Sequence, residues 1–108
     1  MIRYVVVLRR REDFTREQFL DVWLSEHLPL AQLLPGVRAV AFHPAARSDG
    51  EFDGMGTLDF DDLESLEACL ASQAAMELRA HTSTFADSDG SVRVVVDTNA
   101  TSTVKRRD

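Results

Sequence analysis

The sequence contains few cysteines, prolines and glycines: one, three and five respectively among 108 residues. A single cysteine cannot form a disulfide within the chain, which favours a reducing compartment. No apolar run approaches the roughly 18 residues of a membrane-spanning helix, and no charged segment precedes the apolar residues that follow Met1 in the manner of a secretion signal. We therefore expect a cytoplasmic protein with no membrane partner.

Basic residues are also in deficit, with 12 Lys and Arg against 18 Asp and Glu, for a net charge of −6. Because nucleic acids bind to positive surfaces, this balance argues against a nucleic-acid partner. The chain contains no Gly-rich phosphate loop, no nucleophile elbow and no close pair of histidine or cysteine metal ligands. We therefore expect no metal site and no tightly bound cofactor, and nothing supports nucleotide binding or serine-hydrolase chemistry.

The composition is that of one globular domain, with 44% hydrophobic and 28% charged residues. Four apolar, partly β-branched segments predict strands over residues 2–8, 37–43, 52–60 and 91–97. Helical periodicity occupies residues 16–28 and residues 63–80, the latter with a possible restart after Ser72. The order is β-α-β-β-α-β, which predicts an α+β protein with an antiparallel four-stranded sheet and both helices on one face. We place the domain at residues 1–100 and a loose C-terminal tail at residues 101–108.

The first helix has clear boundary signals. Thr15 is a suitable N-cap, Gln18 completes a capping box, and Phe14 with Phe19 forms a hydrophobic staple. Pro29 has no N–H group and its ring clashes with the preceding turn. We therefore expect the helix to end or kink at Pro29.

Three of the four strands are apolar on both faces. In the first, Tyr4 and Val6 alternate with Val5 and Val7, and valines line both faces of the last strand. Helices on one side leave the second apolar face exposed, and such a surface predicts a contact site. We expect a homodimer formed through the open sheet face; the simpler alternative is that the valines reflect β-propensity alone.

His27 is the candidate catalytic residue. It continues the stripe of Phe19 and Trp23 at a spacing of four, so it faces the core, next to the break at Pro29. An imidazole in an apolar pocket can act as a general base or acid near neutral pH. The alternative is a structural histidine bonded to the carbonyl group of Ser25, which Pro29 leaves without a helical partner.

Four aromatic residues are candidates for a substrate pocket: Tyr4, Phe19, Trp23 and Phe42. Core packing explains them equally well. Among other polar groups, we place His81 after the second helical region and expect Asp59 on the sheet face opposite Leu58 and Phe60.

Cys69 and the arginines have structural interpretations. We interpret Cys69 as a small buried hydrophobe between neighbouring leucines. The run of Arg9, Arg10 and Arg11 is expected to form a solvated turn.

The chain resembles the EthD family. The resemblance rests on MIRYVVVLRRR, FTREQFLDVW, WLSEHLPL, the LPG before the second strand and FDGMGTLDFDDLESLEACLAS, and it extends to about Asp97. Its most specific element is W-x-x-x-H-x-P-L at Trp23, His27, Pro29 and Leu30. This resemblance implies a ferredoxin-like protomer that pairs its sheet with a second copy into a dimeric α/β barrel. It also implies a pocket between sheet and helices into which His27 points.

Members of the wider dimeric barrel superfamily include cofactor-independent monooxygenases, polyketide cyclases, muconolactone isomerases and heme enzymes. The expected function is therefore that of a small homodimeric enzyme acting on a small cyclic, aromatic or polyketide-like compound, with His27 as general base or acid. An oxidoreductase, a cyclase or an isomerase fits this expectation. The alternatives are a non-catalytic accessory or ligand-binding protein that uses the same pocket for a small apolar ligand, and a heme-binding barrel protein.

Overall fold

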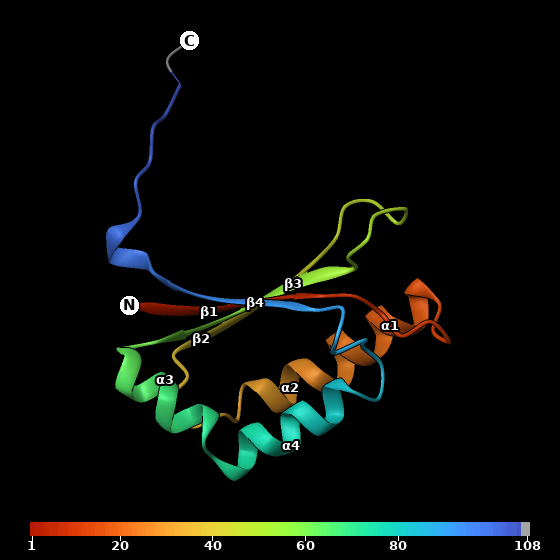
Figure 1. Cartoon of the computed structure of the whole chain (residues 1–108), viewed down its shortest axis with the longest axis horizontal. Helices are drawn as coiled ribbons and strands as arrows, with labels where there is room; N and C mark the ends of the chain where they lie inside the picture. The colour runs from red at the N-terminus through yellow and green to blue at the C-terminus, as the bar shows by residue number, and fades with distance from the viewer. Residues whose placement is uncertain (107–108) are drawn as a thin grey trace.

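A four-stranded sheet with its α-helices on one face forms the molecule (Figure 1). The computed structural model describes residues 1–106. The strands are β1 (Ile2–Leu8), β2 (Ala39–Pro44), β3 (Gly54–Phe60) and β4 (Val92–Asp97). The helices are α1 (Arg16–Val22), a π-helical turn η1 (Trp23–His27), α2 (Leu28–Ala31), α3 (Leu63–Leu70), α4 (Gln73–Thr82) and a terminal 3-10 turn η2 (Thr98–Ala100).

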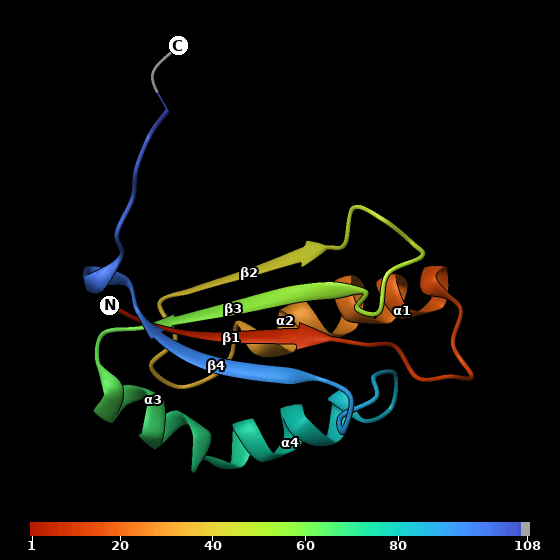
Figure 2. The ribbon, with the colours of Figure 1, turned by 45° about the horizontal axis from the view of Figure 1, so that its top comes forward.

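The sheet is antiparallel throughout, in the order β2-β3-β1-β4 (Figure 2). The predicted α+β class and β-α-β-β-α-β order are confirmed, with each predicted helical region divided into shorter elements. The first strand lies in the centre of the sheet and the last strand lies at its edge. Residues close to both ends of the chain are therefore neighbours, and Thr98 donates its N–H to the carbonyl oxygen of Met1 at 2.9 Å.

The strand registers determine which side chains face the helices. Tyr4 lies opposite Leu58 on β3 and opposite Val95 on β4, and Val6 lies opposite Gly56 and Arg93. Directly paired residues in an antiparallel sheet point to the same face. The helix-facing side therefore carries Tyr4, Val6 and their partners. The open face carries the alternate set: Arg3, Val5, Val7, Ala39, Ala41, His43, Met55, Thr57, Asp59, Val92, Val94 and Val96.

The core between sheet and helices consists of two groups of buried side chains. One surrounds Phe19, Trp23 and Phe85, and the other surrounds Phe60 and Leu66. Phe19, Phe60 and Phe85 are completely buried. Burial of each such aromatic side chain contributes roughly 1.5–3 kcal/mol to folding.

The helix continues past Pro29, so of the two outcomes expected from the sequence, an end or a kink, the first is wrong. Its bonding pattern widens before the proline instead: the N–H of Leu28 donates to the carbonyl oxygen of Trp23, five residues back, in the π-helical turn η1. Backbone torsions stay right-handed helical from Val22 to Gln32. A π-turn is one of the known ways to insert an irregularity into a continuous helix, and here Pro29 falls in the first turn of α2, where a missing N–H costs little.

The predicted capping box of the first helix is confirmed. Thr15 and Gln18 form the reciprocal capping box of α1, with side-chain-to-backbone distances of 3.1 and 2.9 Å. Asp62 caps α3 and Ser72 caps α4. Helix α4 continues to Thr82, beyond residue 80 where the sequence pattern was expected to stop, so it includes His81.

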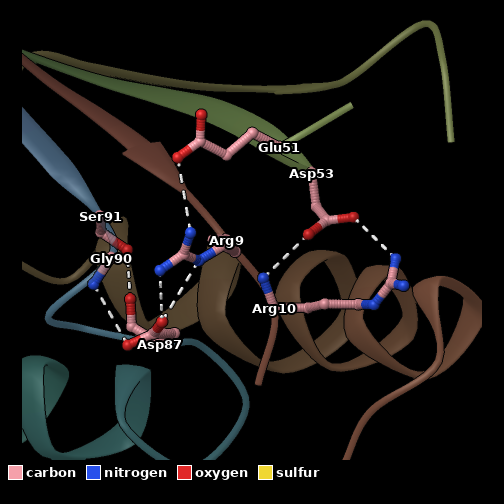
Figure 3. Close-up of polar contacts among 7 residues, drawn as sticks. All are labelled: Arg9, Arg10, Glu51, Asp53, Asp87, Gly90 and Ser91. Atoms are coloured by element: carbon pink, nitrogen blue, oxygen red, sulfur yellow. Dashed lines mark hydrogen bonds and ion pairs between the residues drawn. The ribbon is translucent and has the colours of Figure 1, made fainter. Parts of the chain in front are cut away.

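The arginine run after β1 is not a solvated turn, since each of its members is held by a carboxylate. Arg9 contacts Asp87 and Glu51, and the buried Asp53 accepts from both the backbone N–H and the guanidinium group of Arg10, at 2.8 and 3.1 Å (Figure 3). Arg11 pairs with Asp13. These contacts join the end of β1 to the start of β3 and to the loop after α4, which fixes the end of the sheet beneath α1.

Residues 101–106 form no regular secondary structure. They extend away from the sheet on the side opposite the helices (Figure 1). Residues 107 and 108 of the predicted tail lie outside the described residues. Within residues 1–106, no helix combines the length and apolar character that crossing a membrane requires.

Candidate functional site

A mainly apolar cavity of about 90 Å³ lies between the sheet and the helices. Its walls come from β1, β2, β3 and β4 on one side and from η1, α2, α3 and α4 on the other. The lining side chains are Tyr4, Val6, Leu8, Trp23, His27, Ala31, Leu34, Phe42, Gly56, Leu58, Cys69, Leu70, Ala75, Leu78, Arg79, Thr82 and Arg93. Small-molecule sites in proteins have this character, namely apolar walls with a few placed polar groups.

Three of the four predicted pocket aromatics line this cavity. They are Tyr4, Trp23 and Phe42, and His27 joins them. Trp23 stacks on Phe42 with ring centroids 4.7 Å apart and planes only 6° from parallel. Phe19 does not contribute to the lining; it is completely buried behind Trp23, at a centroid distance of 5.5 Å, and supports the indole from the core.

His27 is held by two residues of α4 rather than by the carbonyl of Ser25. Its Nδ1 lies 2.8 Å from Nδ1 of His81, and its Nε2 lies 3.3 Å from Oγ1 of Thr82. The Thr82 hydroxyl donates its one proton to the carbonyl oxygen of Leu78 at 2.9 Å, so it accepts from His27. His27 therefore carries its proton on Nε2, and its Nδ1 accepts from the Nδ1–H of His81.

This tautomer assignment agrees with the electrostatics of the site. Burial, and secondarily the positive charge that His81 can carry, lower the pKa of His27 to about 4. The ordinary value is about 6.5, so His27 is neutral at pH 7. The side chain is 5% exposed and lies against Phe85 and Phe42, with ring centroids 5.1 and 6.0 Å away.

His81 extends the polar contact toward solvent. Its imidazole is nearly parallel to that of His27, and its Nε2 lies 3.7 Å from a carboxylate oxygen of Glu26. The Glu26 side chain is 59% exposed, whereas that of His81 is 22% exposed. A chain of exchangeable groups thus leads from the surface to the wall of the cavity.

Sequence reasoning missed His81 and Thr82 as members of the site. The signal was present, because Leu78, His81, Thr82 and Phe85 follow the i, i+3, i+4, i+7 spacing of one helix face. Ending the helix at residue 80 hid this pattern. The 54 residues between His27 and His81 also conceal the pair from any search for a local motif.

The other candidate residues lie where the sequence indicated. Cys69 is a free, buried cysteine in the cavity wall. Burial raises the pKa of its thiol, which keeps it uncharged and agrees with its interpretation as a small buried hydrophobe. Asp59 lies on the open face, where two bonds of 2.7 and 3.0 Å from Arg3 hold its carboxylate. The Arg3 guanidinium holds the pKa of Asp59 below its usual range, and neither residue reaches the cavity.

The residues at this site fit neither a metal ion nor a heme. Within residues 1–106 no group of three or more histidine, cysteine or carboxylate side chains is arranged to hold a metal ion. Both nitrogens of His27 are engaged by α4. Axial ligation by His27 would require both the His81 contact and the packing of α4 to change.

Comparison with known families identifies the architecture around this cavity. The family model of the EthD domain matches residues 11–89, which is most of the chain. The chain belongs to the EthD domain family. This confirms the resemblance seen in the sequence, and the matched segment includes His27, His81 and Thr82. No curated protein sequence matches the chain.

Solved structures share the fold at low sequence identity. An EthD family protein from Bacillus halodurans C-125 is 19% identical and superposes with a TM-score of 0.75, covering 90% of this chain and 98% of that one. A dimeric protein of ferredoxin-like fold from Bacteroides fragilis is 15% identical, with a TM-score of 0.70 and coverage of 89% and 94%. SnoaB, a cofactor-independent oxygenase from Streptomyces nogalater, is 11% identical, with a TM-score of 0.67 and coverage of 93% and 94%. The ferredoxin-like fold is thereby established for this EthD domain.

Proposed function

We propose that this EthD domain is an enzyme that moves a proton on a small cyclic, aromatic or polyketide-like compound, without a tightly bound cofactor. The observation that carries the proposal is the His27–His81 pair in the wall of an apolar cavity. The proton would be removed from a carbon next to a carbonyl group or from a phenol. Isomerisation, cyclisation or oxidation can each begin with that step, and the presence of a cofactor-independent oxygenase among the structural neighbours is compatible with the last.

The proposed proton path begins at Nε2 of His27. Both His27 and Thr82 line the cavity, and their contact of 3.3 Å is long for a hydrogen bond, so a substrate oxygen can replace the hydroxyl as acceptor. As His27 donates its Nε2 proton to that oxygen, its Nδ1 takes the Nδ1 proton of His81, and Nε2 of His81 takes a replacement proton from solvent on the side of Glu26, so both imidazoles keep their charge. Nε2 of His27 is then unprotonated and removes the proton from the substrate carbon, which returns both imidazoles to their starting tautomers. A low pKa for His27 suits this role, because the imidazole never has to store a positive charge.

We further propose that the protein is a homodimer formed through the open sheet face. The support is the apolar character of that face: Val92, Val94, Val96 and Met55 are 37–51% exposed although they are large and hydrophobic. The solved neighbours from Bacteroides fragilis and two other bacteria are themselves described as dimeric. Pairing of the two sheets would complete the dimeric α/β barrel implied by the family. We also propose a cytoplasmic location.

The test begins with a search for ligands. Aromatic, lactone and polyketide compounds that raise the melting temperature of the wild-type protein are assayed for conversion by the wild type, His27→Gln and Glu77→Gln. Glu77 is exposed on α4, outside the cavity lining and away from the open sheet face, so its substitution is the control. We expect His27→Gln to bind the same compound but to convert it about 10²–10⁴-fold more slowly, the range typical of a positioned general acid or base.

Equal conversion by wild type and His27→Gln would refute the catalytic role of His27. Binding of a compound without conversion by either protein would favour the other candidate function, a non-catalytic accessory or ligand-binding protein. This second candidate is supported by the contacts of His27 with α4, because both of its ring nitrogens already have partners there.

A further inference from the structure

The charges around the cavity differ from those of the whole chain. Acidic residues outnumber basic residues by 18 to 12, yet the side chains lining the cavity include two arginines, Arg79 and Arg93, and no carboxylate among the described residues. These two arginines are also the lining residues that are exposed, whereas the others are buried or half-buried. They therefore mark the mouth of the cavity and place two positively charged groups there.

The position of Arg93 follows from the backbone. It pairs with Val6 in the β1–β4 register, and Val6 lines the cavity, so the side chain of Arg93 leaves the sheet on the same side. Arg79 lies on α4, across the mouth, and donates to the carbonyl oxygen of Leu70 at 3.3 Å. The two guanidinium groups thus come from the edge strand and from the helix that faces it.

Five of the ten arginines within residues 1–106 are paired with a neighbouring carboxylate. Ion pairs hold Arg3, Arg9, Arg10, Arg11 and Arg38. Within residues 1–106, no ion pair involves Arg79 or Arg93. The chain therefore leaves positive charge unpaired at the entrance of an apolar cavity, although it has a surplus of acidic groups to pair with it.

We propose that the cavity binds a small apolar acid. Its ring or hydrocarbon body lies beside Trp23 and Phe42, and its carboxylate contacts Arg93 and Arg79 at the mouth. A guanidinium group offers paired N–H donors that match a carboxylate, and the unpaired positive charge at the mouth attracts anions to it. This inference rests on the proposed function, because it treats the cavity as the ligand site. It adds that the substrate is an anion.

Calorimetric titration with a matched pair of compounds tests the charge selection. Phenylacetate and phenylacetamide have nearly the same shape, but only the first is charged. We expect phenylacetate to bind at least about fivefold more tightly than phenylacetamide, which corresponds to the upper end of the energy of one exposed ion pair. In Arg93→Gln the preference should fall toward one, and Arg79→Gln should reduce it in part.

Arg47→Gln is the matched control, because Arg47 is an exposed arginine outside the cavity lining and its loss changes the net charge equally. It should keep the wild-type preference. Equal affinity for the two compounds would overturn the anion proposal while leaving the apolar cavity of the proposed function in place. Failure of both compounds to bind, or an equal loss of preference in Arg47→Gln, would overturn it as well. Because binding is measured without turnover, a catalytically inactive protein still gives a decisive result.

Discussion

At the scale of single residues, the site depends on a histidine that burial keeps neutral. His27 has a folded-state pKa of about 4, below the 6.5 of an unfolded chain. Between these values the unfolded chain binds more protons than the folded one, so stability falls as the pH is lowered from about 6.5 to 4. The linked loss between pH 7 and pH 4.5 is about 2 kcal/mol.

Urea unfolding at the two pH values measures this loss. His27→Gln, which cannot titrate, should lose about 2 kcal/mol less than the wild type on acidification. Carboxylates such as Asp59 titrate in both proteins, so their contribution cancels in the comparison. An identical pH dependence in both proteins would show that His27 is not buried in its neutral form.

The sequence predicted His27 but not its partners, for a physical reason. The position of His27 follows from a local period of four with Phe19 and Trp23, which a helix converts directly into one face. His81 and Thr82 meet it only after the chain has passed through two strands and α3. Phe19 was predicted to line the pocket but lies in the core. The period of four shows that a side chain faces inward, but it does not show whether that side chain reaches the surface of a cavity.

At the scale of elements, the cavity depends on how closely η1 approaches the sheet. The four strands, to within two residues at each end, and the capping box of α1 could be predicted. The capping box rests on side chains only three residues apart. The π-helical turn could not be predicted, because a proline removes a donor and crowds the preceding turn without specifying whether the helix ends, kinks or widens. Glycines in β3 then permit the contact, with the indole of Trp23 lying directly over Gly54.

Gly54→Ala tests this close approach. A Cβ at this position would lie 2.5 Å from two ring atoms of Trp23, so the indole must move. We expect a destabilisation of about 1–3 kcal/mol, typical of overpacking in a core, measured by urea unfolding. Gly50→Ala is the control: its nearest neighbour, the carbonyl oxygen of Phe52, lies at 3.9 Å, and the change should be within about 0.5 kcal/mol. Similar losses in both variants would contradict the packing described for Trp23.

At the scale of the whole molecule, one apolar sheet face has no helix over it (Figure 1). We predict that Val94→Asp converts the dimer to a monomer, because a carboxylate would be buried against the partner sheet without a counter-charge. Val95→Asp is the matched control, since the neighbouring side chain is similarly exposed, at 44% against 49%, but points to the helix side. Light scattering at micromolar concentration gives the masses, for which a protomer has 12.1 kDa. A wild-type protein of protomer mass would refute the interface.

The central claim is that the His27–His81 pair moves a proton on a compound held in the cavity. The most direct measurement is exchange of the benzylic protons of phenylpyruvate, an apolar acid with a carbonyl group beside a CH₂ group, in D₂O by NMR. Exchange reports proton removal whatever step follows it. We predict that the wild type accelerates exchange and that His27→Gln, still folded, reduces this acceleration by about 10²-fold or more. Equal exchange rates with wild type and His27→Gln would contradict the account.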